Sequence, residues 1–130
     1  MYVLDINTLI YFFKGLGNVH SALLKEAPNT IGIPTIVLHE LEVGIAKSNS
    51  ADKRITQLEA LTSIVNSLPF GKNEVRCAAA IRADLEIMDT PIGAYDVLIA
   101  GTAMSNQGIL VTHNTKEFER IEGLQLEDWY

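Results

Sequence analysis

Short apolar runs alternate along the chain with longer segments of mixed polarity. Two runs are typical of buried strands, Tyr2-Val3-Leu4 and Ile109-Leu110-Val111-Thr112, because a central parallel strand is covered on both faces. Ile31-Gly32-Ile33 predicts another short strand, and Leu68-Pro69-Phe70 predicts an edge strand, where proline is tolerated. A tail from Leu124 to Trp129 alternates apolar and polar residues.

Between these runs, apolar residues recur at helical spacing. The predicted helices are residues 7–13, a second helix capped by Asn18, a helix starting at Thr35, residues 53–66, a helix from a cap at Asn73 to about residue 88, residues 94–106, and the short segment 116–120. Strands and helices that alternate in this way predict an α/β sandwich with a mainly parallel central sheet. At 130 residues, we expect a single domain spanning 1–130.

Polar side chains follow the two most apolar strands. Asp5 comes directly after the first strand, and His113 and Asn114 follow the strand at Ile109. In open parallel sheets, ligands bind at the carboxyl ends of strands. Two further acids are unusual: Glu40 falls on the apolar side of its predicted helix, and Asp96 lies in the first turn of another. A carboxylate on an apolar face is costly unless it is paired, protonated or bound to metal.

Each acid also has a structural explanation. Asp5 could cap the following helix, Asp96 could complement a helix dipole, and Glu40 could pair with a buried Arg82. Asn114 and Glu117 match the spacing of a capping box. Taken together, these oxygen donors suit Mg²⁺ or Mn²⁺.

Composition limits the possible functions. Lys and Arg number 10 against 16 Asp and Glu, and the net charge of −6 argues against nucleic-acid binding through a general basic surface. The three histidines lack the paired spacing of zinc ligands, and no glycine-rich phosphate loop or Gly-x-Ser-x-Gly motif occurs. The single cysteine, Cys77, fits a small core residue of a reduced compartment. Without a membrane span or export segment, we expect a soluble cytoplasmic protein.

At these residues the sequence resembles the PIN-domain ribonucleases, and within them the VapC toxins. The resemblance rests on the ordered set Leu4-Asp5-Ile6-Asn7, His39 to Gly44, Pro91-Ile92-Gly93-Ala94-Tyr95-Asp96, Val111 to Phe118, and the ending Gly123 to Trp129. The last two segments are similar to the VapC branch that cuts the anticodon loop of initiator tRNA. The resemblance implies a PIN-like fold and a Mg²⁺-dependent endoribonuclease, with Mn²⁺ as a possible substitute.

The resemblance also implies roles for individual residues. Asp5, Glu40 and Asp96 would be the acidic metal ligands, and Asn114 would complete the catalytic set at the position of a fourth acid. A metal-activated water would attack phosphorus in line and leave a 5′-phosphate and a 3′-hydroxyl. Ile6 stands where the family usually has threonine, which predicts weakened activity.

Partners follow from the same resemblance. It implies a homodimer and a VapB-type antitoxin whose basic side chain is attracted to the acidic pocket. The residues expected to bind the RNA substrate are Arg82, Thr112, Lys116 and Asn7. Two alternatives remain open at this stage. One is a catalytically weak binding module that keeps the antitoxin interface, and the other is a phosphoacceptor signalling domain, for which no mid-chain strand ending in aspartate is evident.

Overall fold

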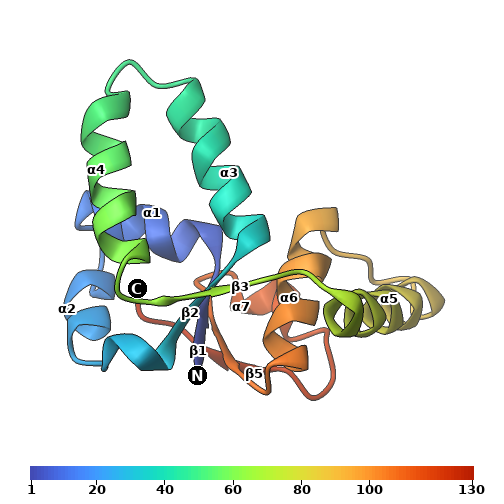
Figure 1. Cartoon of the computed structure of the whole chain (residues 1–130). Coiled ribbons are helices and arrows are strands. Elements are labelled where there is room, and N and C mark those ends of the chain that lie inside the picture. Colours follow the sequence, from blue (N-terminus) through green and yellow to red (C-terminus); the bar gives the residue numbers. More distant parts are fainter.

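A parallel five-stranded sheet forms the centre of the computed structural model, which describes residues 1–130 (Figure 1). The strands are β1 (Tyr2–Leu4), β2 (Ile31–Pro34), β3 (Asn66–Leu68), β4 (Ile109–Val111) and β5 (Gln125–Glu127). Their order is β3-β2-β1-β4-β5, and all neighbouring pairs are parallel. The chain therefore extends the sheet first on one side of β1 and then on the other.

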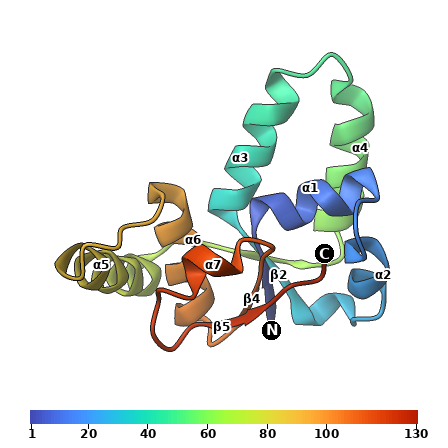
Figure 2. The same ribbon diagram turned by 180° about the vertical axis from the view of Figure 1, so that it is seen from behind.

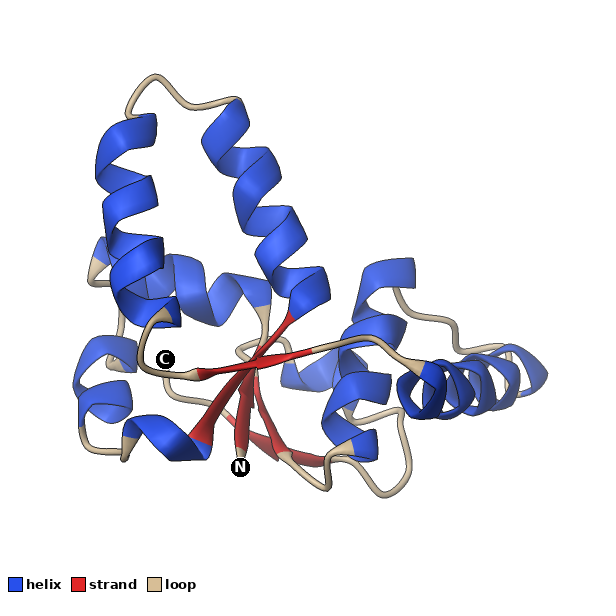
Figure 3. Ribbon diagram, in the orientation of Figure 1, coloured by secondary structure: helices blue, strands red, loops and turns tan.

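The helices lie on both faces of this sheet. They are α1 (Ile6–Lys14), α2 (Val19–Leu24), α3 (Thr35–Ala46), α4 (Ala51–Thr62), α5 (Lys72–Ile87), α6 (Ala94–Ser105) and α7 (Thr115–Phe118), with a 3-10 turn, η1 (Pro28–Thr30). α1, α2 and α4 lie to one side of the strands, and α5 and α6 lie to the other (Figure 3). The predicted α/β sandwich with a parallel sheet is confirmed.

The core is densest around the middle strands. Val3 in β1, Ile33 in β2 and Leu110 in β4 are fully buried, as the apolar runs predicted. α5 and α6 pack with little space between them, because a Cβ at Gly101 would lie 2.7 Å from the Cβ of Ala78. The small residues of α5 permit this close approach.

Several boundaries differ from the sequence prediction. α4 ends at Thr62 rather than at residue 66, and the edge strand β3 is Asn66–Leu68 rather than residues 68–70. The Asn66 side chain donates hydrogen bonds to the Asn29 and Ile31 carbonyls. Long-range pairing with β2 therefore overrides the local helical pattern. α5 begins after Gly71, whose backbone N–H donates to Oε1 of Glu74 at 2.9 Å, so Asn73 does not cap it.

α3 and α4 form a hairpin that projects from the body of the molecule (Figure 2). On α3, the buried residues Val37, Leu41 and Ile45 form a stripe at a spacing of four, and Ile36 and Leu38 in the first turn are partly buried against the core. No helix in the chain has the length and apolarity needed to cross a membrane.

Candidate active site

Several of the polar residues predicted from the sequence lie where the direction of chain winding reverses. β1 and β4 are neighbours in the sheet, with Leu4 opposite Val111, although they come from opposite ends of the sequence. Asp5 and Thr112 therefore leave the same edge side by side. A crevice at such a switch point is the usual ligand site of open parallel sheets.

Asp5 is held in place by the first turn of α1. Its Oδ1 accepts a 2.9 Å hydrogen bond from the backbone N–H of Thr8, so it caps this helix. The Thr8 hydroxyl donates to the Val111 carbonyl at 3.0 Å and ties the helix to β4. Asp5 is only 4% exposed. Burial raises its pKa, the nearby hydroxyls of Thr112 and Thr8 lower it, and the charge of Asp128 raises it.

Asp96 lies in the first turn of α6 and faces the same region. Burial raises its pKa, and the charges of Glu117 and Asp5 raise it further. Gly93 makes room for this side chain, since a Cβ there would lie 3.3 Å from Oδ2 of Asp96. The α6 terminus thus brings a second carboxylate within electrostatic reach of Asp5.

Glu117 is an acidic neighbour to which the sequence analysis gave no chemical role. The expected capping box is wrong: the Asn114 backbone N–H donates to the Thr112 hydroxyl at 3.0 Å, and the Asn114 side chain makes no cap hydrogen bond. Instead, Asn114 Nδ2 donates to Oε2 of Glu117 at 2.9 Å. In the sequence, the acid one helical turn after Asn114 could have indicated a fourth carboxylate at the site.

Glu40 differs from the expectation of a buried acid. Its side chain is 29% exposed, and its nearest charged partner is His39, with Nδ1 3.8 Å from Oε1. Glu40 lines a hollow of about 300 Å³ together with Ile6, Lys14 and Arg54. The alternative explanation, a pairing with a buried Arg82, does not hold, because Arg82 is exposed on α5 and bonds Glu86 at 3.0 Å.

The arrangement fits a hydrated divalent cation better than a fully enclosed ion. No three acidic or histidine side chains converge on one point in this structure. However, Asp5, Asp96 and Glu117 have no basic partner, since the ion pairs are His39–Glu40, Arg82–Glu86 and His113–Asp128. Magnesium commonly uses one or two carboxylates and retains several waters. This donor set therefore suits Mg²⁺ or Mn²⁺.

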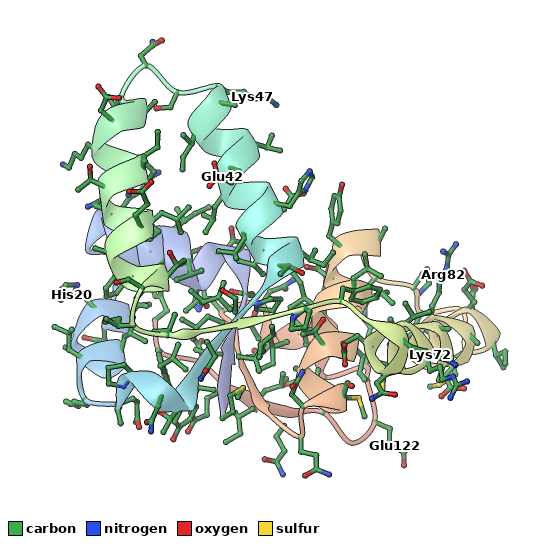
Figure 4. The ribbon with its side chains drawn as sticks, viewed as in Figure 1. His20, Glu42, Lys47, Lys72, Arg82 and Glu122 are labelled. Carbon is green, nitrogen blue, oxygen red and sulfur yellow. The ribbon has the colours of Figure 1, made fainter.

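The predicted substrate-binding residues occupy different parts of the surface. Asn7 and Lys116 are exposed on the first turns of α1 and α7, next to the acidic side chains, whereas Thr112 is fully buried. Arg82 points away from the body on α5, as does Lys72, and Lys47 lies at the end of α3 (Figure 4). These basic groups therefore lie on different elements, while Lys14 and Arg54 line the hollow that contains Glu40. Arg120, just after α7, has a structural contact: its Nη1 donates to the Pro91 carbonyl at 3.1 Å.

Comparison with known proteins gives consistent results over nearly the whole chain. A model of the PIN domain matches residues 2–124. The tRNA(fMet)-specific endonuclease VapC of Salmonella typhimurium is 34% identical over 128 residues, covering 98% of this chain and 97% of the relative. Ribonuclease VapC2 of Rickettsia felis is 35% identical over 131 residues, covering 99% and 98%.

The same likeness extends to three dimensions. A chain in the crystal structure of VapBC2 from Rickettsia felis, bound to a DNA fragment from their promoter, aligns with a TM-score of 0.91 and 34% identity. The alignment covers 99% of this chain and 98% of that one.

Proposed function

The chain belongs to the PIN domain family and, within it, to the VapC ribonucleases; on this premise we propose that it is a divalent-metal-dependent endoribonuclease, the toxin of a type II toxin–antitoxin pair. The proposal applies to residues 1–130 as one catalytic domain, acting in the cytoplasm. The reaction is inferred from the sequence relationship, and the residues that carry it out are inferred from the geometry of this chain.

The observation that carries the proposal is the group of uncompensated carboxylates at the ends of β1 and β4. Burial raises the pKa of Asp96, the negative charges of Glu117 and Asp5 raise it further, and no basic side chain forms an ion pair with any of the three. Like charges held near one another, with Asp5 buried and Asp96 and Glu117 partly buried, are unfavourable for folding alone. Their proximity is explained if the site binds a cation.

We assign Asp5 and Asp96, with Glu117 beside them, as acidic residues that hold Mg²⁺, with Mn²⁺ as a substitute. Glu40 is assigned to the same set from the sequence relationship. When bound, the cation would neutralise the scissile phosphate and provide an activated water. Asp5 has a fixed direction because Thr8 holds its Oδ1. Asn114 belongs to the catalytic set through its hydrogen bond to Glu117, which makes Asn114 a positioning residue.

The proposed substrate is RNA, and specifically the anticodon loop of initiator tRNA, by analogy with the Salmonella typhimurium relative. Asn7 and Lys116 border the carboxylates and would contact the backbone of the RNA. Thr112 is buried, so its contribution would be to orient Asp5. Arg82 would contact RNA only after exchanging its bond to Glu86.

We further propose a VapB-type antitoxin partner and a homodimer. An apolar groove between α1, α2 and α4 is lined by residues that include Phe12, Leu23 and Leu61. Phe13 and Lys14 border both this groove and the hollow that contains Glu40. An antitoxin segment lying in the groove would therefore reach the acidic site, where a basic side chain would be attracted.

One observation favours a second candidate, a catalytically weak module that retains the antitoxin interface. Ile6 lines the same hollow as Glu40, where the family usually has threonine. An aliphatic group there supplies no hydrogen bond to a water or a carboxylate. The two candidates share the fold and the partner and differ in turnover.

The test is cleavage of a total tRNA pool by the purified, antitoxin-free protein with Mg²⁺ or Mn²⁺. EDTA and Asp96→Asn, which preserves side-chain shape, serve as controls. Cleavage at one anticodon loop that leaves a 5′-phosphate and disappears in both controls would support the proposal. A 2′,3′-cyclic product would contradict it, and a folded protein that cuts no RNA would favour the binding module.

A further inference from the structure

Two aromatic rings form an exposed stack beside the acidic site. The His113 and Tyr130 rings lie 4.3 Å apart at an interplanar angle of 26°. The His113 side chain is 46% exposed and Tyr130 is 43% exposed, so the pair keeps about half of its surface accessible. Paired, half-exposed rings provide a flat apolar surface.

Hydrogen bonds fix this stack from several sides. His113 Nδ1 lies 2.9 Å from Oδ2 of Asp128, and the other oxygen of Asp128 accepts from the Tyr130 backbone N–H at 2.9 Å. The Tyr130 carbonyl accepts from the Asn18 backbone N–H at 2.7 Å and from Asn18 Nδ2 at 3.1 Å. Both rings are therefore held before any ligand arrives.

Packing beneath Tyr130 is equally specific. The Tyr11 ring supports it edge-on, with centroids 4.9 Å apart at 70°. Gly17 has a φ of +62°, and a Cβ there would lie 2.9 Å from the Tyr130 ring. Only glycine at position 17 therefore lets the Tyr130 ring pack this closely without strain. The elements involved are α1, the turn before α2 and the segment after β5.

The stack borders the proposed catalytic residues. His113 directly follows Thr112, whose hydroxyl is near Asp5. Asp128, which contacts His113, is close enough to Asp5 for its charge to act on that carboxyl group. The platform and the carboxylates thus share one edge of the sheet.

Because the protein is acidic, contacts that do not depend on charge are important for binding RNA. The net charge is −6, and the basic residues lie on several elements, with Arg82 and Lys72 on α5, Lys47 after the end of α3 (Figure 4), and Lys14 and Arg54 beside Glu40. Proteins that bind unpaired nucleotides gain affinity when bases stack on aromatic side chains. Stacking is insensitive to the sign of the protein's net charge.

We propose that the His113–Tyr130 stack is a platform on which an unpaired base of the RNA substrate stacks, beside the phosphate to be cut. The inference rests on the proposed ribonuclease function and adds a substrate-positioning surface to it. Single-stranded RNA is favoured as the ligand because the bases of a duplex already stack on one another and cannot stack on an aromatic side chain.

The experiment measures binding separately from cleavage. The probe is an RNA hairpin with a 2-aminopurine in its loop, titrated into protein that carries Asp96→Asn so that the RNA stays intact. We expect quenching of the 2-aminopurine fluorescence, because this base loses emission when it stacks. Tyr130→Leu in the same background should abolish the quenching and raise Kd by about tenfold, within the range of base–aromatic stacking.

Tyr130→Phe is the conservative variant. All hydrogen bonds of Tyr130 involve its backbone, so phenylalanine should retain both the quenching and the affinity. Tyr2→Leu is the control for loss of a ring, since Tyr2 packs on Trp129 at the amino-terminal end of β1. Its Kd should equal that of the parent protein.

The outcomes separate this inference from the proposed function. Unchanged Kd and quenching in folded Tyr130→Leu protein would overturn the platform, even if the wild-type protein cuts RNA. A Tyr130→Leu variant that loses antitoxin affinity but not RNA affinity would also overturn it. A wild-type protein that cuts no RNA counts against the ribonuclease, whereas the binding assay still reports on the stack.

Discussion

The amide of Asn114 holds the carboxylate of Glu117, with 2.9 Å between Nδ2 and Oε2. This contact connects the loop after β4 to an acid whose charge acts on Asp96. Asn114 is a neutral residue at a position where an acid was expected. It therefore orients an acid, Glu117, one helical turn later.

Glu117→Gln should lower kcat strongly, and Asn114→Ala should lower it by about fivefold, the equivalent of roughly 1 kcal/mol for one hydrogen bond. In the Glu117→Gln background, Asn114→Ala should cause little further loss, because coupled residues are not additive. Single-turnover cleavage of tRNA measures both. Asn106→Ala, which removes an amide bonded to the Thr102 carbonyl, is the matched control. Additive losses would contradict the positioning role.

Ile6→Thr should raise activity. The new hydroxyl would face the hollow that contains Glu40 and provide one hydrogen bond, for a gain of about fivefold in kcat/KM. Ile10→Thr, one turn further along α1 in the same hollow, should bring no gain. Equal effects of the two substitutions would show that the change in polarity, rather than the position, matters.

Asp5→Asn should stabilise the protein without metal, by an amount that depends on pH. Burial raises the Asp5 pKa above its ordinary value of 3.8, so the native state binds this proton more tightly than the unfolded chain. The wild-type protein therefore loses stability as pH rises from the ordinary value through the raised pKa. Asparagine also caps helices but carries no charge.

Urea unfolding in EDTA at a series of pH values tests this expectation. The difference between Asp5→Asn and wild type should be small in acid, increase with pH and then level off. Asp5→Ala should fall below Asp5→Asn by about 1 kcal/mol, the value of the lost cap. A difference that stays constant with pH would argue against a buried charged carboxylate.

Mg²⁺ should raise the melting temperature of the wild-type protein, because it binds the folded state. At a concentration 100 times Kd, the stabilisation is about 2.7 kcal/mol. Asp96→Asn should remove most of this increase, whereas Asp84→Asn, at an exposed position of α5, should preserve it. Differential scanning fluorimetry with Mg²⁺ and EDTA measures the shift. Equal shifts in all three proteins would place the cation elsewhere.

Ser105→Ala should destabilise the contact between α5 and α6. The Ser105 hydroxyl donates to Oε2 of Glu74 at 2.6 Å, and this bond and the Gly71 N–H lower the Glu74 pKa. The stabilisation is therefore present above the ordinary pKa of glutamate and is lost as pH falls through the lowered value. Thermal melts should show a deficit at neutral pH that shrinks in acid. Ser63→Ala should show no such pH dependence, because Ser63 is the C-cap of α4 and its hydroxyl donates to the Ala60 carbonyl.

The parts of the fold that the sequence predicted well are those controlled by continuous burial. β1 and β4 could be predicted from their apolar residues, because a strand covered on both faces consists mainly of apolar residues. The edge strand β3 was misplaced because Asn66 is fixed by hydrogen bonds to Asn29 and Ile31, which lie far away in sequence.

Local patterns were less reliable for the acidic residues. The helical projection put Glu40 on an apolar side, yet α3 projects in a hairpin and buries only the stripe of Val37, Leu41 and Ile45. The spacing of Asn114 and Glu117 fitted a capping box, but the side chains bond each other instead. Both errors arise because tertiary packing decides which side of a helix meets the protein and which hydrogen-bond donor meets which acceptor.

The pairing of β1 with β4 also has a consequence for protein synthesis. The hydrogen bond from Thr8 to Val111 joins residues that are 103 positions apart, so the first carboxylate cannot meet the Asn114 loop until most of the chain has left the ribosome. Contacts at such separation form late in folding. A nascent chain therefore carries Asp5 without the rest of the site until the segment that contains Val111 and Asn114 has emerged and folded against it.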